Sequence, residues 1–195
     1  MARLRDIVLA LLSRDWAGLV IAGAVLAVTW LLAIALGGRW WLSAGGVVAA
    51  VLVFASLRHQ ALLAAARRAQ PPPGRKIDLG GYHVHLLAEG STPAGRAPVV
   101  WFAGGHASGF AIHHLHRAFR GETRSILIDR PGTGWSDAGP FPRSTAREAD
   151  EMVLALERAG ETGPFIWVGH SFGGLLVANI ARRRPELVHT VVLLD

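Results

Sequence analysis

The sequence predicts an α/β fold with a mainly parallel sheet, preceded by a hairpin of two transmembrane helices. Three observations support this prediction. Two long uncharged apolar runs lie within residues 17–57, short apolar runs alternate with helical patterns after residue 75, and Ser171 lies between a strand pattern and a helix pattern. Strands that alternate with helices form parallel sheets covered on both faces, which defines the fold class.

The composition favours a membrane partner over a nucleic acid. Of the 195 residues, 51% are hydrophobic, and 20 Lys and Arg against 14 Asp and Glu give a formal net charge of +6. Many basic residues flank the apolar runs, and basic and aromatic residues do not interleave as they do in nucleic-acid modules. The chain has no cysteine, so disulfides and cysteine metal sites are excluded.

Residues 1–74 are predicted to anchor the chain in a lipid bilayer. The run 17–36 would form a helix about 30 Å long, which matches the hydrocarbon core of a membrane. Gly37-Gly38-Arg39 separates it from a second apolar run, residues 40–57. Neither run has a polar stripe, which disfavours a core helix of a soluble protein. Tryptophans lie at the ends of the runs, where indole rings favour the headgroup region: Trp16, Trp40 and Trp41.

Basic residues around the runs predict which side of the membrane each end occupies. Three arginines precede the first run, the tip carries one, and five basic residues follow the second run: Arg3, Arg5 and Arg14; Arg39; Arg58, Arg67, Arg68, Arg75 and Lys76. The positive-inside rule therefore predicts a multi-pass protein with two helices, its tip outside and residues 75–195 on the cytoplasmic face. A cleaved signal peptide is the open alternative, since Ala33-Ile34-Ala35 resembles a cleavage site.

Residues 75–195 are predicted to form the N-terminal part of an α/β domain, after Pro71-Pro72-Pro73-Gly74 ends a helical continuation. The expected elements are a β-hairpin (77–79 and 82–87), a strand (98–102), a helix (111–120), a strand (125–129), a helix (145–159), a strand (165–168), a helix (175–184) and a strand (191–194). Thr145 and Glu148 have the spacing of a capping box. His83 and His85 alternate with apolar neighbours and are interpreted as exposed strand residues.

Ser171 lies in the segment Gly169-His170-Ser171-Phe172-Gly173-Gly174, between the strand 165–168 and a helix that Pro185 ends. A G-x-S-x-G turn in this context is a nucleophile elbow. Glycines at 169 and 173 remove side chains that would collide in the sharp turn, and a helix N-terminus favours developing negative charge. The alternative is a turn of small residues with no chemistry.

Three motifs in sequence order resemble those of the α/β-hydrolase fold superfamily of esterases, lipases and related hydrolases: Trp101–His106, Asp129–Ser136 and Gly169–Gly174. The resemblance covers 76–195 and implies that Ser171 is the nucleophile and that the amide of Phe172 is one oxyanion donor. The second donor would come from Gly105, with Gly104 or His106 as alternatives. These stay open because the chain has Ala103-Gly104 where the family usually has histidine-glycine.

The acid and the base of a triad are expected in the order serine, acid, histidine. His189 is the only histidine after Ser171 and is expected at the far end of the sheet, so the catalytic histidine is expected beyond Asp195. The chain is accordingly interpreted as C-terminally truncated. Asp195 is either the acid or a strand-end aspartate that caps the next loop. His170 is interpreted as part of the elbow rather than as a base.

The predicted function is that of a membrane-anchored serine hydrolase, which cleaves a small-molecule ester, or as second choice an amide, through an acyl-enzyme. Four histidines near the third strand are interpreted as helix and loop residues at the pocket mouth, not as a metal site: His106, His113, His114 and His116. No cofactor and no metal are expected. Two alternatives stay open, a non-catalytic binding module of the same fold and an inactive truncated fragment.

Overall fold

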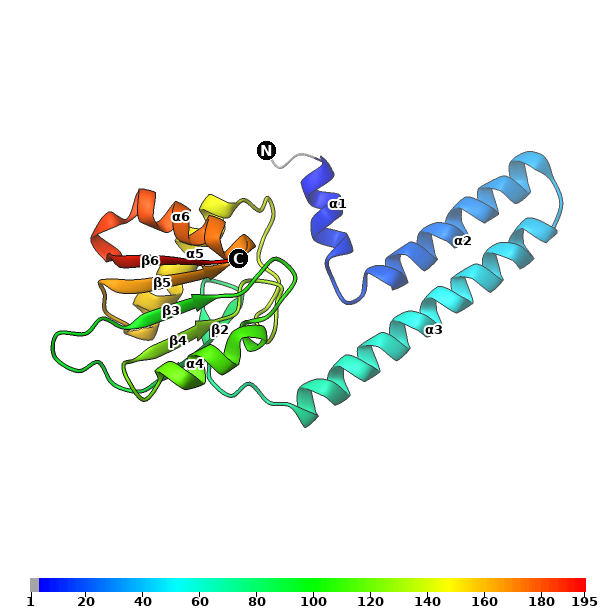
Figure 1. Cartoon of the computed structure of the whole chain (residues 1–195). Helices are drawn as coiled ribbons and strands as arrows, with labels where there is room; N and C mark the ends of the chain where they lie inside the picture. Colours follow the sequence, from blue (N-terminus) through cyan, green and yellow to red (C-terminus); the bar gives the residue numbers. More distant parts are fainter. Residues whose placement is uncertain (1–3) are drawn as a thin grey trace. The chain divides into compact units, whose positions relative to one another are not determined.

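The computed structural model describes residues 4–195, so Arg3 of the predicted basic flank lies outside the described residues (Figure 1). The chain divides into two compact units, residues 1–71 and 72–195. The first unit holds three helices, α1 (Leu4–Leu12), α2 (Ala17–Leu36) and α3 (Trp40–Ala69).

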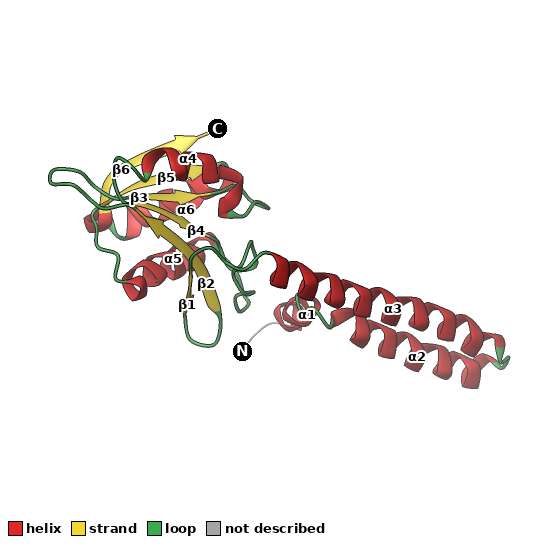
Figure 2. Cartoon of the chain, turned by 90° about the horizontal axis from the view of Figure 1, so that it is seen from below, coloured by secondary structure: helices red, strands yellow, loops and turns green. Residues whose placement is uncertain are grey.

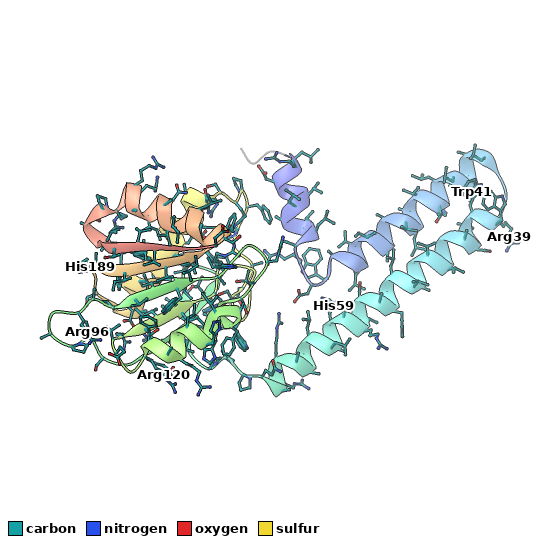
Figure 3. All side chains as sticks on the ribbon, in the orientation of Figure 1. Arg39, Trp41, His59, Arg96, Arg120 and His189 are labelled. Carbon is teal, nitrogen blue, oxygen red and sulfur yellow. The ribbon has the colours of Figure 1, made fainter. Side chains whose placement is uncertain are left out.

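The helices α2 and α3 lie side by side and antiparallel, with Arg39 in the turn between them and Trp41 in the first turn of α3 (Figures 1 and 3). The helix α2 covers the first predicted apolar run, whereas α3 extends without a break from the second run through the predicted helical continuation. Both helices are long and apolar enough to cross a membrane.

Small residues form the interface between α2 and α3, while the large apolar side chains face outward. Ala22 and Ala49 are only 2% and 4% exposed, whereas Leu31 and Val51 are 58% and 60% exposed. A Cβ placed on Gly45 would lie 2.6 Å from Thr29 Cβ. This arrangement is typical of membrane helices, which approach closely at small residues because lipid solvates the large ones.

Replacing Gly45 with leucine is expected to separate α2 from α3, because the new side chain would overlap Thr29. A disulfide between introduced cysteines reports the packing, since a Cβ on Gly18 would lie 3.3 Å from Ser56 Cβ and the chain has no cysteine of its own. We expect Gly18→Cys/Ser56→Cys to cross-link upon oxidation in membranes and Gly45→Leu to lower the yield at least about tenfold.

The matched control is Gly46→Leu, because a Cβ on Gly46 has no atom within 4 Å. This variant adds the same side chain one residue further along the same helix. Equal loss of cross-linking in the two variants would show that the hairpin is not packed through Gly45.

The second unit contains one six-stranded sheet in the order β1-β2-β4-β3-β5-β6 (Figure 2). The strands are β1 (Arg75–Asp78), β2 (His83–Glu89), β3 (Val99–Phe102), β4 (Ser125–Ile128), β5 (Phe165–His170) and β6 (Val188–Leu194). The strands β4, β3, β5 and β6 are parallel, while β1 and β2 form an antiparallel hairpin that joins β4. The predicted α/β fold with a mainly parallel sheet is therefore confirmed.

Helices cover both faces of the sheet. The helices are α4 (His113–Phe119), α5 (Thr145–Ala159) and α6 (Phe172–Arg183), with short 3-10 turns η1 (Gly109–Ile112) and η2 (Pro185–Leu187). Alternate residues of β3 face opposite layers, so Val100 and Phe102 pack in the core under α5 and α6, and Trp101 packs on the other side with α4 (Figure 2). Buried parallel strands have this apolar character on both faces.

The N-terminus of α5 differs from the prediction by one residue. Ser144, not Thr145, is the N-cap, because its backbone is extended (φ −149°, ψ 157°) and its side chain accepts a hydrogen bond from the amide of Arg147 at 3.2 Å. The hydroxyl of Thr145 instead accepts from Asn179 of α6 at 3.2 Å. Ser144 therefore caps the N-terminus of α5, and Thr145 links α5 to α6.

Candidate active site

Ser171 has the strained backbone of a sharp strand-to-helix turn. Its φ is 50° and its ψ is −118°, and among residues 4–195 it is the one non-glycine residue with a positive φ. Such conformations cost about 1–3 kcal/mol and persist only where the surroundings enforce them. Here β5 ends at His170 and α6 begins at Phe172, so a single residue makes the whole turn.

The two glycines around Ser171 are required by backbone contacts. A Cβ on Gly169 would lie 2.6 Å from the carbonyl carbon of Gly173, and a Cβ on Gly173 would lie 2.6 Å from the carbonyl oxygen of Phe102 in β3. The first contact is the crowding within the turn that the motif predicts. The second is with a neighbouring strand, so Gly173 also allows α6 to approach β3.

The loop after β3 lies directly against this turn. A Cβ on Gly104 would be 3.5 Å from Ser171 Cβ and 3.1 Å from His170 Nδ1, and one on Gly105 would be 3.7 Å from Phe172 Cβ. The fold therefore brings together the residues that the sequence analysis selected from two distant segments. The short distances leave room for backbone atoms but not for larger side chains at Gly104.

Three backbone amides near Ser171 are available to a ligand. Phe172 is the first residue of α6, so its amide has no acceptor within the helix. The amides of Gly105 and His106 donate no hydrogen bond to any residue in the described range 4–195. Free amides at a helix N-terminus and in a glycine loop suit a developing oxyanion.

Asp129 and His85 form a buried pair that the sequence analysis missed. His85 was expected on an exposed strand face, but it is 0% exposed, and its Nδ1 lies 3.0 Å from Asp129 Oδ2. The same carboxylate accepts the amide of Gly109 at 2.6 Å and the amide of Trp135 at 3.1 Å. Asp129 thus ties the loop after β3 to the loop after β4. The position of Asp129 directly after a strand, in a glycine-rich motif, is the feature of the sequence that could have indicated this role.

His116 also differs from the expectation. Instead of lying at the pocket mouth, it is 0% exposed, with Nε2 2.9 Å from Glu89 and Nδ1 3.0 Å from the hydroxyl of Ser125. Ser125 is itself fully buried and accepts a hydrogen bond from Trp101 Nε1 at 2.8 Å. This serine, histidine and carboxylate resemble a triad in connectivity, but no substrate can reach the buried hydroxyl, so their role is structural.

The buried His116 is expected to make stability depend on pH. Burial is the main cause that lowers its pKa below 6.5, its ordinary value. Below about pH 6.5 the unfolded chain therefore binds a proton that the folded chain does not, and stability falls as the pH falls through this window. Thermal unfolding of the whole protein between about pH 7.5 and 5.5 should show this loss, and His116→Gln should reduce it. His189→Gln, at an exposed position, is the control that should leave it unchanged.

The remaining predicted residues lie along β6. Its register pairs Phe165 with Val188 and His170 with Leu194, so Asp195 follows at the Ser171 edge of the sheet. His189 lies at the opposite end of the strand (Figure 3), and its Nδ1 contacts Thr190 Oγ1 at 2.9 Å.

The exposed His106 and His114 join no metal-binding group, and the described residues contain no cluster of three His, Asp or Glu with that geometry.

A sheet with this strand order and a serine in a glycine-flanked turn after β5 defines a protein of the α/β-hydrolase class. The family model for the α/β hydrolase fold matches residues 98–195, and the chain belongs to this family. A putative carbamate hydrolase, RutD of Klebsiella pneumoniae (strain 342), is 37% identical over 102 residues, which are 51% of this chain and 38% of that protein.

Two further similarities cover comparable parts of the chain. An uncharacterized vacuolar membrane protein of Saccharomyces cerevisiae (strain YJM789) is 30% identical over 109 residues, 51% of this chain and 16% of that protein. The crystal structure of Cfl2 from Burkholderia cenocepacia aligns with a TM-score of 0.57 at 27% identity, over 62% of this chain and 40% of that chain. The chain thus spans less than half the length of these relatives.

Proposed function

We propose that the protein is a serine hydrolase that cleaves an ester bond through an acyl-enzyme on Ser171. The observation that carries the proposal is the strained turn at Ser171, beside the free amides of Phe172 and Gly105. The family membership makes hydrolysis the expected class of reaction. A serine held at such a turn projects from the sheet edge, where a substrate carbonyl can approach it.

In the proposed mechanism, Ser171 Oγ attacks the carbonyl carbon, and the amides of Phe172 and Gly105 hold the oxyanion. His106 is the alternative donor, since its amide is also free. The hydroxyl of Ser171 makes no hydrogen bond within residues 4–195, so the base that takes its proton is proposed to be a histidine that follows Asp195. That histidine would then protonate the leaving group, and Asp195 is one candidate to orient it.

A carbamate is a second candidate substrate, favoured by the similarity to RutD. Esters and carbamates share the carbonyl that Ser171 would attack and the oxyanion that forms. Turnover of a matched ester and carbamate by the whole protein distinguishes them. Covalent labelling by a fluorophosphonate tests the shared mechanism, because the probe reacts with an activated serine; no labelling would favour the binding-module alternative.

We also propose that α2 and α3 form a membrane hairpin that anchors the hydrolase unit at the cytoplasmic face. The outward apolar side chains of both helices support it, as do their lengths of 20 and 30 residues. The similarity to a vacuolar membrane protein also supports membrane association. The many basic residues after the apolar part of α3, against Arg39 alone at the tip, support the orientation.

Reporter fusions should reveal this orientation. A reporter that is active only in the cytoplasm is expected to be active when fused after Pro73 and inactive when fused at Arg39. The reason is the excess of Lys and Arg near the two chain ends of the hairpin. A reporter that is active only on the non-cytoplasmic side of the membrane is the control at the same two positions and should give the reverse pattern. Activity at Arg39 but not after Pro73 would contradict the cytoplasmic placement.

A further inference from the structure

Arg130 reaches both backbone segments that flank the candidate oxyanion site. It is the second residue after β4 and is only 6% exposed. Its Nη2 donates to the carbonyl oxygen of Gly104 at 2.8 Å and also to that of Gly105. Its guanidinium carbon lies 4.8 Å from the centre of the Phe172 ring. One buried cation therefore contacts the loop after β3 and the first residue of α6.

These contacts determine where the amides of the loop point. In a trans peptide the C=O and N–H groups point in opposite directions. When the carbonyl of Gly104 points to Arg130, the amide of Gly105 points away from it, and the same holds for the carbonyl of Gly105 and the amide of His106. A charged donor at a carbonyl also polarises the peptide, which makes the amide on its other side a stronger donor.

Arg130 is held in turn by its surroundings. Its Nη1 lies 3.4 Å from Oε2 of Glu148 in α5. The preceding residue, Asp129, binds the amide of Gly109 at 2.6 Å, at the far end of the same loop. Two adjacent residues after β4 therefore hold the loop at both ends, one through its carbonyls and one through an amide.

We infer that Arg130 is a positioning residue for the oxyanion site, which orients and polarises the amides of Gly105 and His106 and keeps them beside the amide of Phe172. The inference rests on the proposed hydrolase function. Arg130 contacts carbonyl oxygens and a ring, so its effect on the reaction passes through the loop. It should therefore act on the transition state, where negative charge develops on the carbonyl oxygen, more than on substrate binding.

The test compares Arg130→Lys and Arg130→Ala in the whole protein. We expect kcat to fall about tenfold to a hundredfold while KM changes less than about threefold, and the rate of fluorophosphonate labelling to fall in parallel. Lysine cannot keep the planar fork that reaches two carbonyls and Glu148, so it should restore activity only in part. Added guanidinium ion should raise kcat of Arg130→Ala, because the ion can occupy the space that the Arg130 side chain leaves. A variant that had lost activity through misfolding would not be rescued by the ion.

Arg143→Gln is the matched control. Arg143 lies 3.3 Å from Glu148 and 2.9 Å from Glu151, so it belongs to the same ion-pair network, but it donates no hydrogen bond to the carbonyls of Gly104 or Gly105. This variant should keep kcat within about threefold of the unmodified protein. An equal loss of kcat in both variants, or full activity in Arg130→Ala, would overturn the inference and leave the hydrolase function intact. Absence of Ser171 labelling in the unmodified protein would instead reject the function and the inference together.

Discussion

Ser171→Ala is expected to abolish covalent labelling by a fluorophosphonate and to lower hydrolysis by several orders of magnitude, as loss of a triad member does. The hydroxyl is the one group at the strained turn that can form an acyl-enzyme. The remaining amides of Phe172 and Gly105 can still bind a carbonyl oxygen, so residual activity would reflect only their contribution. The measurement is labelling and ester turnover by the whole protein, with the labelled peptide identified by mass spectrometry.

Ser108→Ala is the control for this prediction. Ser108 also lies in a loop at this edge of the sheet, and its side chain makes no capping hydrogen bond to the 3-10 turn that follows. Labelling should therefore be unchanged. Ser136→Ala should also keep the label on Ser171, although its hydroxyl donates to the carbonyl of Asp129 at 2.7 Å and the variant should be less stable. If Ser171→Ala kept full activity, the chain would be a binding module or would use another nucleophile.

The second large effect is expected at Gly173. In Gly173→Ala the new Cβ would lie 2.6 Å from the carbonyl oxygen of Phe102 and 2.9 Å from that of Ala103. Both contacts are with backbone atoms, at the end of β3 and in the residue that follows it, and these atoms cannot move aside as a flexible side chain can. We expect a loss of about 2 kcal/mol or more in the free energy of unfolding and no detectable Ser171 labelling. Gly173→Val should be more severe still.

Gly174→Ala provides a control at the neighbouring position. Its Cβ would meet the terminal carbon of Leu193 at 3.3 Å, and this side chain can shift by a few tenths of an ångström. The substitution is the same, and the helix is the same, but no backbone lies in the way. Thermal unfolding and labelling should both stay close to those of the unmodified protein. Equal damage from the two substitutions would mean that the close approach of α6 to β3 does not decide the result.

Features that depend on a short stretch of the chain were predicted correctly from the sequence. The apolar run 17–36 coincides with α2, because the length and polarity of a membrane-compatible helix are properties of consecutive residues. Ser171 was selected because a strand pattern, two glycines and a helix pattern surround it within a short stretch. The predicted N-cap of α5, Thr145, was wrong by one residue. Both Ser144 and Thr145 have side chains that can cap a helix, and only the backbone conformation distinguishes them.

The environments of His85 and His116 were predicted wrongly, because distant segments of the chain form them. The alternation of His83 and His85 predicted one exposed face, yet His85 is buried because its face of β2 meets Asp129 at the end of β4. His116 was placed at the pocket mouth but lies on the inner side of α4, where Glu89 and Ser125 from two strands satisfy its ring. Periodicity describes an element, but it does not say what packs against each face.

The sequence by itself determined that this protein has two membrane-length helices, an α/β domain and a serine in a glycine-flanked turn from strand to helix, because these features depend on residues close together in the chain. Only the tertiary structure decided that Gly173 must be small because Phe102 lies against it, and that Arg130 holds Gly104 and Gly105 beside Phe172. Steric contacts and hydrogen bonds act over a few ångströms between segments far apart in sequence. They are therefore defined only when the order of the strands brings those segments together.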